Sequence, residues 1–177
     1  MRITGLDLGI GKMGLCTIDV SNIKPFKKLD IVSMKTFQLD KKSKSINKFE
    51  QFILTFEKEI ATVIGRSDMV VVEKPFGLRG YANILYELLG VVKYLCITSG
   101  VSRYEISPMT LKKFATGSGK AQKSDIVLKA FKEFGVEGNS EDEIDALYCA
   151  LIGDCVLSSH KYSIGRIAAL KNIVNKN

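Results

Sequence analysis

The sequence has few of the residues that build zinc sites and disulfide-rich domains. It contains one histidine and three prolines among 177 residues. None of its four cysteines belongs to a Cys-x-x-Cys pair, which argues against a structural zinc site and against a redox motif. We therefore expect a protein of a reducing compartment, in which the cysteines are small core residues. The four are Cys16, Cys96, Cys149 and Cys155.

Long apolar runs and a basic-then-apolar leader are also missing. No run approaches the roughly 18 to 20 apolar residues that a membrane-spanning helix needs. The hydrophobic content of 46% is nevertheless enough for one sizeable core. The sequence predicts a single soluble domain with a cytoplasmic location.

Acidic residues are outnumbered by basic ones, and the formal net charge is +7. This excess favours a polyanionic partner, because lysines and arginines placed on phosphates release condensed counterions. Basic residues gather in segments 41–48 and 160–177. Either segment alone also fits an ordinary solvated surface, so composition does not identify the partner.

Hydrophobic periodicity predicts an α/β protein with the element order β-β-β-α-β-α-β-α, followed by two more helices. Ser140, with Glu143 three residues later, forms a capping box that should start the last long helix at Glu141. The predicted strands are two in segment 2–20, then 29–39, 67–74 and 102–106. The predicted helices are 46–65, 81–97, a short one opened by Ser107 and Pro108, 123–134, and one within 138–157.

The first predicted hairpin carries an acid inside an apolar strand. Asp7 lies between two leucines, where a carboxylate loses hydration that only a cation or hydrogen-bond donors can restore. Gly9, Gly11 and Gly14 follow and suit a tight reversal of the chain. Taken alone, Asp7 fits a turn cap as well as it fits a functional role.

Three more acids stand at the ends of predicted elements. Glu73 ends a short apolar strand, and Asp142 and Asp145 lie three residues apart in the first turns of the last long helix. Negative charge at a helix N-terminus is favourable by about 0.3 to 1 kcal/mol, which accounts for the neighbouring glutamates. It accounts poorly for Asp145, because the apolar stripe that follows enters the core.

Four gathered carboxylates repel one another unless a cation lies among them, and oxygen-only ligands favour Mg²⁺ or Mn²⁺. Two such ions, about 3.5 to 4 Å apart, activate a water molecule and stabilise the leaving oxygen of a phosphodiester. The constellation of Asp7, Glu73, Asp142 and Asp145 therefore predicts a metal-dependent nuclease.

The acidic motifs resemble those of the RuvC-like Holliday junction resolvases of the RNase H superfamily, in order and in spacing. They read LDLG with Asp7, VVVEKPF with Glu73, and DEIDALYCAL with Asp142 and Asp145. The resemblance runs from Arg2 to Leu157 and implies an RNase H-like fold with a five-stranded mixed sheet. It also implies a nuclease domain over 1–159, which leaves 160–177 as a basic extension of the same domain.

A basic segment supplies the most specific match. Residues 107–123, SPMTLKKFATGSGKAQK, are similar to the family's Ser-Pro, Lys, then Gly-x-Gly-x-Ala-x-Lys segment. The resemblance assigns Lys112 and Lys123 to the family's basic positions, with Lys123 catalytic and both lysines binding nucleic acid. Lys113 and Lys120 of this segment are further candidate contacts. From spacing alone, Lys112 and Lys113 fit a solvated helix face equally well.

Phe76 and two departures from the family pattern complete the comparison. Phe76, three residues after Glu73, matches the aromatic residue that the family uses near the junction centre, although a core plug beside Pro75 is the alternative. Leu8 stands where bacterial members usually carry proline, and the extension after His160 matches no motif. An origin in a bacterium, a phage or a large virus is therefore left open, and with it a bacterial or a host-cell cytoplasm.

The resemblance implies a homodimer that presents two active sites to a four-way DNA junction. The four acids would hold two Mg²⁺, with Mn²⁺ able to substitute, and in-line attack by water would leave 5′-phosphate and 3′-hydroxyl ends. A relative that acts on structured RNA or other branched nucleic acid is the alternative.

Two other classes of protein fit less well. An actin-like ATPase or sugar kinase also opens with Asp-x-Gly, but it needs two domains and a second such hairpin. A binding module without catalysis leaves the four acids unexplained in a protein that must attract phosphate.

Overall fold

The computed structural model describes residues 1–9, 12–21, 29–38, 48–77 and 81–171. The predicted order of strands and helices is confirmed, and one short C-terminal helix, α6, was not predicted. None of the described helices is long and apolar enough to cross a membrane. The strands are β1 (Arg2–Asp7), β2 (Lys12–Asp19), β3 (Ile31–Gln38), β4 (Met69–Glu73) and β5 (Ser102–Ile106). The helices are α1 (Lys48–Ile64), α2 (Tyr81–Thr98), α3 (Pro108–Thr116), α4 (Lys123–Phe134), α5 (Glu141–Leu157), the 3₁₀ turn η1 (Ser159–Lys161) and α6 (Ile164–Ala169).

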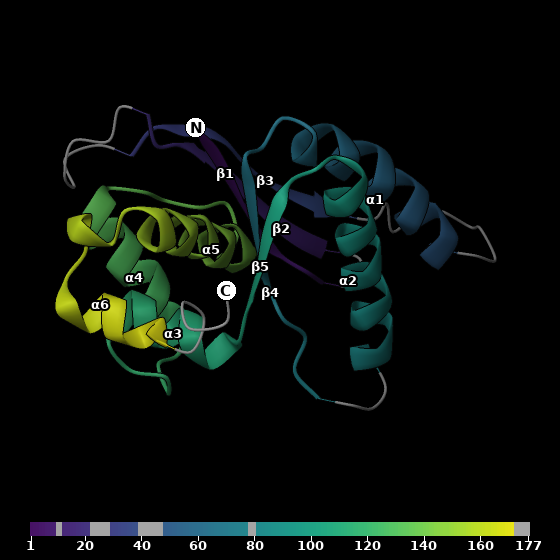
Figure 1. Cartoon of the computed structure of the whole chain (residues 1–177). Coiled ribbons are helices and arrows are strands. Elements are labelled where there is room, and N and C mark those ends of the chain that lie inside the picture. Colours follow the sequence, from purple (N-terminus) through teal and green to yellow (C-terminus); the bar gives the residue numbers. More distant parts are fainter. Residues whose placement is uncertain (10–11, 22–28, 39–47, 78–80, 172–177) are drawn as a thin grey trace.

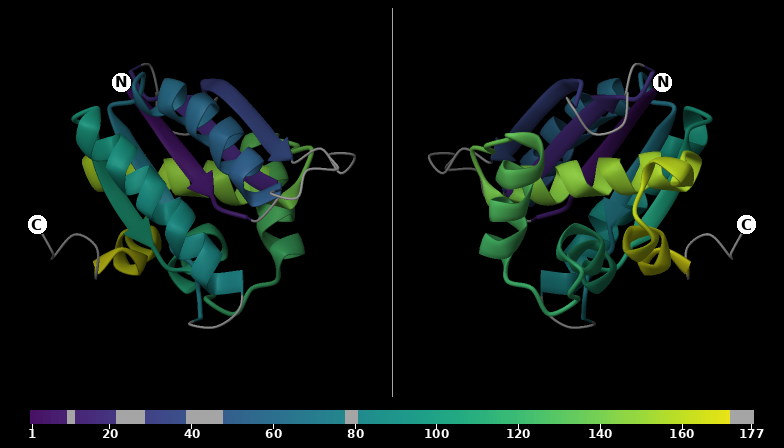
Figure 2. Two further views of the ribbon diagram at one scale, coloured as in Figure 1. Left: turned by 90° about the vertical axis from the view of Figure 1, so that its right-hand side faces the viewer. Right: turned by 90° about the vertical axis from the view of Figure 1, so that its left-hand side faces the viewer.

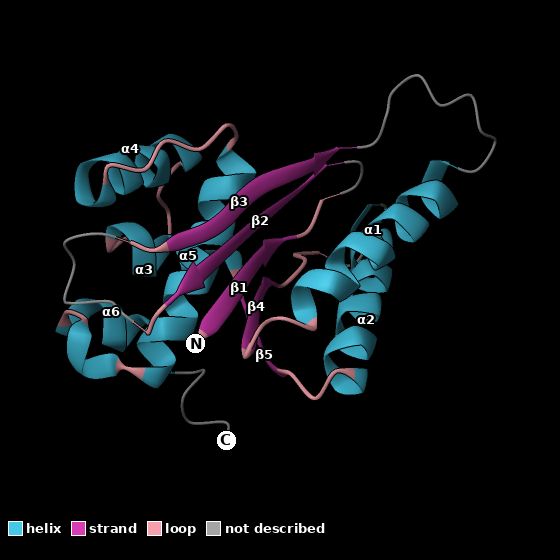
Figure 3. Cartoon of the chain, turned by 90° about the horizontal axis from the view of Figure 1, so that it is seen from above, coloured by secondary structure: helices cyan, strands magenta, loops and turns pink. Residues whose placement is uncertain are grey.

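The five strands form one mixed sheet in the order β3-β2-β1-β4-β5, as Figure 3 shows from above. β1, β2 and β3 form an antiparallel meander, whereas β4 runs parallel to β1 and to β5. Leu6 of β1 is the partner of Val72 of β4, so Asp7 and Glu73 follow directly at the same edge of the sheet. The predicted five-stranded mixed sheet is confirmed.

Helices cover both faces of the sheet. Figures 1 and 2 show α1 and α2 on one face, and α5 with α3, α4 and α6 on the other. β4 is buried on both faces and is therefore continuously apolar: Val70 and Val72 pack in the core under α1 and α2, and Met69 and Val71 in the core under α5.

The hairpin lets α5 approach the sheet closely. A Cβ atom at Gly5 would lie 1.9 Å from the carbonyl oxygen of Ala146, and one at Gly14 would lie 1.9 Å from that of Asp142. Gly14 was predicted as a turn residue, but it lies within β2, opposite Asp7. Because both positions lack a side chain, the helix backbone can rest on the hairpin, which places the first turn of α5 beside Asp7.

The N-terminus of α5 is anchored to β3 as well as capped. The Ser140 hydroxyl accepts a hydrogen bond from the Glu143 amide at 3.2 Å, as the predicted capping box requires. The Glu143 carboxylate is only 1% exposed and accepts from the Asn139 amide and from the Thr36 hydroxyl, both at 2.8 Å. The carboxylate of the predicted box thus bonds the amide one residue before Ser140 and ties the helix to the sheet.

Helix α1 and the four cysteines agree with the sequence predictions in the part of the chain that the structure describes. α1 has buried Phe56, Ile60 and Ile64 along one stripe, while the predicted start of this helix at Ile46 lies outside the described residues. The four cysteines are buried and unpaired, as predicted.

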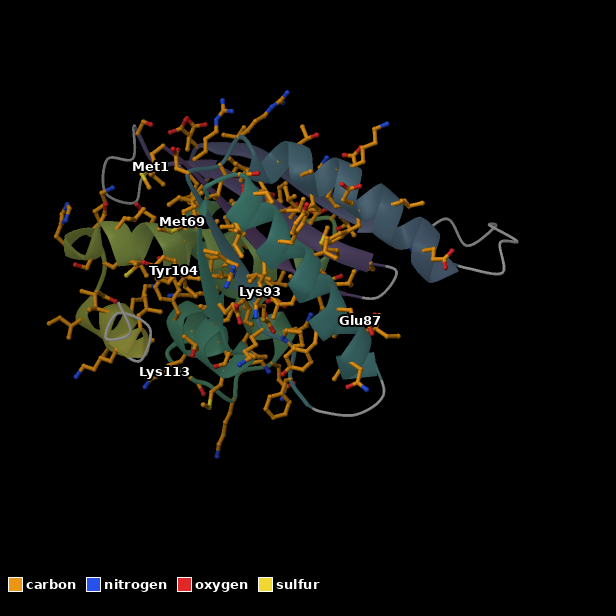
Figure 4. The ribbon with its side chains drawn as sticks, turned by 45° about the vertical axis from the view of Figure 1, so that its right-hand side comes forward. Met1, Met69, Glu87, Lys93, Tyr104 and Lys113 are labelled. Atoms are coloured by element: carbon orange, nitrogen blue, oxygen red, sulfur yellow. The ribbon has the colours of Figure 1, made fainter. Side chains whose placement is uncertain are left out.

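One face of α2 packs on the sheet, and the opposite face is open to solvent. Leu88, Val92 and Leu95 are buried, whereas Tyr94 and Ile97 are exposed. Figure 4 shows Lys93 on the side of α2 near β5, where its Nζ lies 3.2 Å from a carboxylate oxygen of Glu105. The predicted apolar character around most of α2 therefore includes surface that the sheet does not cover.

Candidate active site

The four predicted acids meet at one edge of the sheet. Asp7 and Glu73 come from the ends of the neighbouring parallel strands β1 and β4. Asp142 and Asp145 come from the first two turns of α5, which the hairpin glycines bring against β1 and β2. Residues separated by more than 130 positions in the chain thus form one acidic cluster.

Lys123 supplies a positive charge within this cluster. It is the first residue of α4, and its Nζ lies 3.0 Å from Asp145 Oδ2, 3.3 Å from Asp142 Oδ1 and 4.0 Å from Asp7 Oδ2. Burial by itself would lower the pKa of the ammonium group, but the negative charges of Asp145 and the other acids outweigh it, so the pKa lies above its ordinary value. Lys123 therefore stays charged at physiological pH.

A second lysine at the cluster was missed by the sequence analysis. Lys12 Nζ, at the start of β2, lies 2.8 Å from Asp142 Oδ2. No motif singles out this lysine. The only available signal was its place directly after the turn that follows Asp7.

The acids have unequal electrostatic environments. Burial, followed by the negative charges of Glu73 and Asp145, raises the pKa of Asp7 well above its usual range. Burial and then the charge of Asp145 raise the pKa of Glu73 to about 7. Burial raises the pKa of Asp145 in spite of Lys123.

Asp142 differs from the other three acids. Burial acts to raise its pKa, but the hydrogen bond from Lys12 and the charge of Lys123 outweigh burial, and the pKa lies below its ordinary value. The most fully neutralised carboxylate of the cluster is thus the one with two lysine partners.

The donor chemistry of the cluster suits a hard divalent cation. Its oxygen-only carboxylates are the ligands that Mg²⁺ and Mn²⁺ prefer, and two paired ammonium groups leave four acids with excess negative charge. Within the described ranges, no three His, Cys, Asp or Glu side chains are arranged as a group that could hold a metal ion. The Lys123 ammonium instead lies among three of the carboxylates.

Phe76 lies on the surface. Its side chain is 88% exposed, whereas Pro75 beside it is buried. The backbone pairing of β4 continues for one residue, because the Lys74 amide donates to the carbonyl of Ile106 at 2.7 Å, and Phe76 follows two residues later. The interpretation of Phe76 as a core plug is therefore wrong.

The lysines of the basic segment differ in their surroundings. Lys112 of α3 is half-buried, and its positive charge acts on the Glu73 carboxyl against the effect of burial. Lys113 and Lys120 are exposed, and Figure 4 shows Lys113 at the outer side of α3. A solvated helix face describes Lys113, whereas Lys112 belongs electrostatically to the acidic cluster.

Two basic residues of the C-terminal segment are used within the protein. Arg166 donates to both carboxylate oxygens of Glu133, at 2.6 and 2.8 Å, and to the carbonyl of Phe114 at 3.1 Å. Lys161 Nζ lies 3.5 Å from Asp154 Oδ1. These contacts fasten η1 and α6 to the rest of the domain.

Sequence comparison finds relatives over most of the chain. No protein-family model matches the sequence. The crossover junction endodeoxyribonuclease RuvC of Caldicellulosiruptor saccharolyticus is 29% identical over 157 residues, which cover 85% of this chain and 90% of the relative. The RuvC of Prochlorococcus marinus is 28% identical over 159 residues and is covered to 97%.

Solved structures share the fold. Thermus thermophilus RuvC in complex with a Holliday junction substrate aligns with a TM-score of 0.69 and 24% identity, over 85% of this chain and 91% of that one. A Fowlpox virus resolvase in complex with Holliday junction DNA aligns with a TM-score of 0.51 and 13% identity over 89% of this chain and 99% of that one. The RNase H-like fold predicted from the motifs is confirmed, and the chain is similar to the RuvC crossover junction endodeoxyribonucleases in sequence and to the RuvC structures in fold.

Proposed function

We propose that the protein is a structure-selective endodeoxyribonuclease that resolves four-way DNA junctions by metal-dependent phosphodiester hydrolysis. The observation that carries this function is the acidic cluster of Asp7, Glu73, Asp142 and Asp145 with Lys123 among its carboxylates. The relatives are named crossover junction endodeoxyribonucleases, and two proteins of similar fold bind Holliday junction DNA. An excess of basic residues suits the same substrate.

The four acids would hold two Mg²⁺ ions, for which Mn²⁺ should substitute. Such a pair supplies an activated water nucleophile and charge stabilisation of the leaving oxygen, with 5′-phosphate and 3′-hydroxyl ends as products. The backbone holds these ligands in place. Asp7 and Glu73 lie at strand ends, and Asp145 is buried near the start of α5.

The lysines of the site would bind the substrate. Lys123 stays protonated among the acids and can donate hydrogen bonds to a non-bridging oxygen of the scissile phosphate. Lys112, half-buried at the side of Glu73, would orient the same phosphate or its neighbour. Exposed Lys113 and Lys120 would contact phosphates farther from the scissile bond.

Phe76 would distinguish a branch point from intact duplex. An exposed aromatic ring three residues after Glu73 can stack on an unpaired or strained base, a contact worth about 1 to 3 kcal/mol. We expect Phe76→Ala to reduce junction cleavage much more than it changes the salt dependence of binding. Full cleavage by this variant would contradict the stacking role, and an unchanged melting temperature is the control for folding.

A homodimer with α2 in its interface fits the exposed Tyr94 and Ile97, because apolar surface that one sheet cannot cover is usually closed by a partner. Sedimentation of wild type and of the doubly substituted Tyr94→Ser, Ile97→Ser variant tests this interface. A wild-type monomer at micromolar concentration would contradict it.

The proposal also includes one nuclease domain over 1–159, an extension over 160–177 and a cytoplasmic location.

The deciding experiment compares three substrates under identical Mg²⁺ concentrations: a four-way junction, linear duplex of the same sequence and structured RNA. We expect junction cleavage at paired positions in two strands and little cleavage of duplex. Asp7→Asn is the matched inactive control. Preferred cleavage of structured RNA would favour the alternative, an RNase H-like nuclease for RNA or other branched nucleic acid.

A further inference from the structure

Both oxygens of the Asp142 carboxylate face lysine ammonium groups. Lys12 Nζ lies 2.8 Å from Oδ2, and Lys123 Nζ lies 3.3 Å from Oδ1. The two lysines come from different elements, since Lys12 begins β2 of the hairpin and Lys123 begins α4. Lys123 also contacts two other acids, whereas Lys12, among the residues that the structure describes, forms its ion pair with Asp142.

A divalent ion and the Lys12 ammonium need the same atom. Mg²⁺ binds a carboxylate oxygen at about 2.0 to 2.1 Å, so an ammonium that kept its own contact with that oxygen would lie close to a doubly charged cation. Like charges at such a distance repel, and each would favour the other's departure. Asp142 Oδ2 therefore serves either Lys12 or a metal ion well, but not both.

We propose that Lys12 competes with divalent metal ions for the Asp142 carboxylate and thereby weakens metal binding at this site. The inference rests on the proposed function, because that function supplies the metal. It adds a positioning residue that no acidic motif contains. Lys12 keeps Asp142 ordered through its ion pair and gives the carboxylate up when an ion binds.

The surroundings of Lys12 allow this exchange. Its side chain is 44% exposed, so the ammonium can move into water without losing buried contacts. An exposed ion pair of this kind is weak, so a bound metal ion can displace it. Lys123, which contacts three acids at once, is held much more firmly.

The test is a calorimetric titration of Mn²⁺ into the protein without DNA, which measures the Mn²⁺ affinity. Lys12→Met keeps the length of the side chain and removes its charge, and we expect Mn²⁺ to bind about two- to fivefold more tightly than to wild type. Lys12→Arg keeps the charge and should bind Mn²⁺ about as wild type does. Lys35→Met is the matched control, because Lys35 lies on neighbouring β3, is 42% exposed and has its Nζ 3.2 Å from a carboxylate oxygen of Glu59 on α1.

The pairing itself is tested in an Asp142→Asn background. There, Lys12→Met should change the Mn²⁺ affinity much less than in the parent, because the shared carboxylate is gone. An affinity that Lys12→Met leaves unchanged or lowers would overturn the competition. So would an equal gain in the Lys35→Met control or an undiminished gain in the Asp142→Asn background.

Failure of the inference can be told apart from failure of the proposed function. If wild type binds Mn²⁺ and cleaves junctions while Lys12→Met has the same Mn²⁺ affinity, only the role of Lys12 is overturned. If neither wild type nor Lys12→Met binds Mn²⁺ at millimolar concentration, the proposed metal site falls and the competition falls with it.

Discussion

Helix α5 carries acids at both of its ends, and the two ends have different charge balances. At the C-terminal end, Asp154 is 1% exposed, accepts a hydrogen bond from the Tyr162 hydroxyl at 2.8 Å and faces Lys161 at 3.5 Å. At the N-terminal end, Lys123 lies among Asp142, Asp145 and Asp7, and Lys12 pairs with Asp142. Glu73 adds a fourth carboxylate to this cluster.

The two ends of α5 differ in charge balance and not in burial, because both carry a buried aspartate. Asp154 lies near the negative end of the helix dipole and is offset by one lysine and one hydroxyl group, which is the pattern of a structural contact. The N-terminal cluster has more carboxylates than cations. Such an excess costs stability and is typical of a site that binds a cation.

The largest expected effect is loss of cleavage at the N-terminal end. Asp7→Asn, Glu73→Gln, Asp142→Asn and Asp145→Asn should each reduce the single-turnover rate by more than about 10³-fold, because each removes a proposed metal ligand. Junction binding, measured by gel shift in Ca²⁺, should persist since the basic surface is unchanged. Near wild-type turnover of a variant at saturating Mg²⁺ would show that the substituted residue is not a ligand. Asp142 is the acid most exposed to this test, because neighbouring Glu141 could serve in its place.

The corresponding change at the C-terminal end should affect stability instead. Asp154→Ala removes the buried carboxylate that faces the Lys161 ammonium and accepts from the Tyr162 hydroxyl, and removing one partner of a buried pair costs about 3 to 5 kcal/mol. Urea denaturation would measure the loss. Cleavage per folded molecule should stay within a few-fold of wild type. A catalytic defect without destabilisation would contradict a purely structural role for Asp154.

The pH dependence of stability should reveal the unfavourable charge of Glu73 in the acidic cluster. The pKa of Glu73 is raised to about 7, so its protonated form favours the folded state, and the stability that this gives is complete below pH 4.5 and is lost as the pH rises through 7. In EDTA, Glu73→Gln should therefore stabilise the protein at pH 8 by roughly 1 to 3 kcal/mol and by much less at pH 5. An equal change in the free energy of unfolding at both pH values would show that the charged form of Glu73, disfavoured by burial and by the charge of Asp145, is not the cause.

The smallest expected effect concerns the salt dependence of DNA binding. Lys113→Ala and Lys120→Ala should each lower the slope of log affinity against log salt by about 1, because each is expected to lose one phosphate contact. Arg166→Ala should leave the slope unchanged, since Arg166 is 11% exposed and bonded to Glu133. A slope reduced by Arg166→Ala would mean that this arginine leaves its partner to bind DNA.

Local patterns were enough to predict most elements. β5 and α4 have the predicted bounds, and Ser140 caps α5 as predicted, because strand alternation, helical periodicity and capping depend on neighbouring residues. α6 was missed. It is a six-residue helix whose position depends on the contacts of Arg166 with α3 and α4, which no local pattern encodes.

The exposure of Phe76 was also beyond the sequence. An aromatic residue between Pro75 and a glycine fits a buried plug as well as a surface contact, and only the packing of the surrounding chain decides between them. The structure buries Pro75 and leaves Phe76 in solvent.

Residue type and spacing were enough to predict the order of the elements, the four acids at element ends and the basic segment of residues 107–123. Which groups share the site depends instead on how the elements pack against one another. Gly5 and Gly14 set the distance between α5 and the hairpin, because a side chain at either position would collide with the helix backbone. That close approach brings Lys12 to Asp142, a contact between residues 130 positions apart, which spacing along the chain cannot reveal.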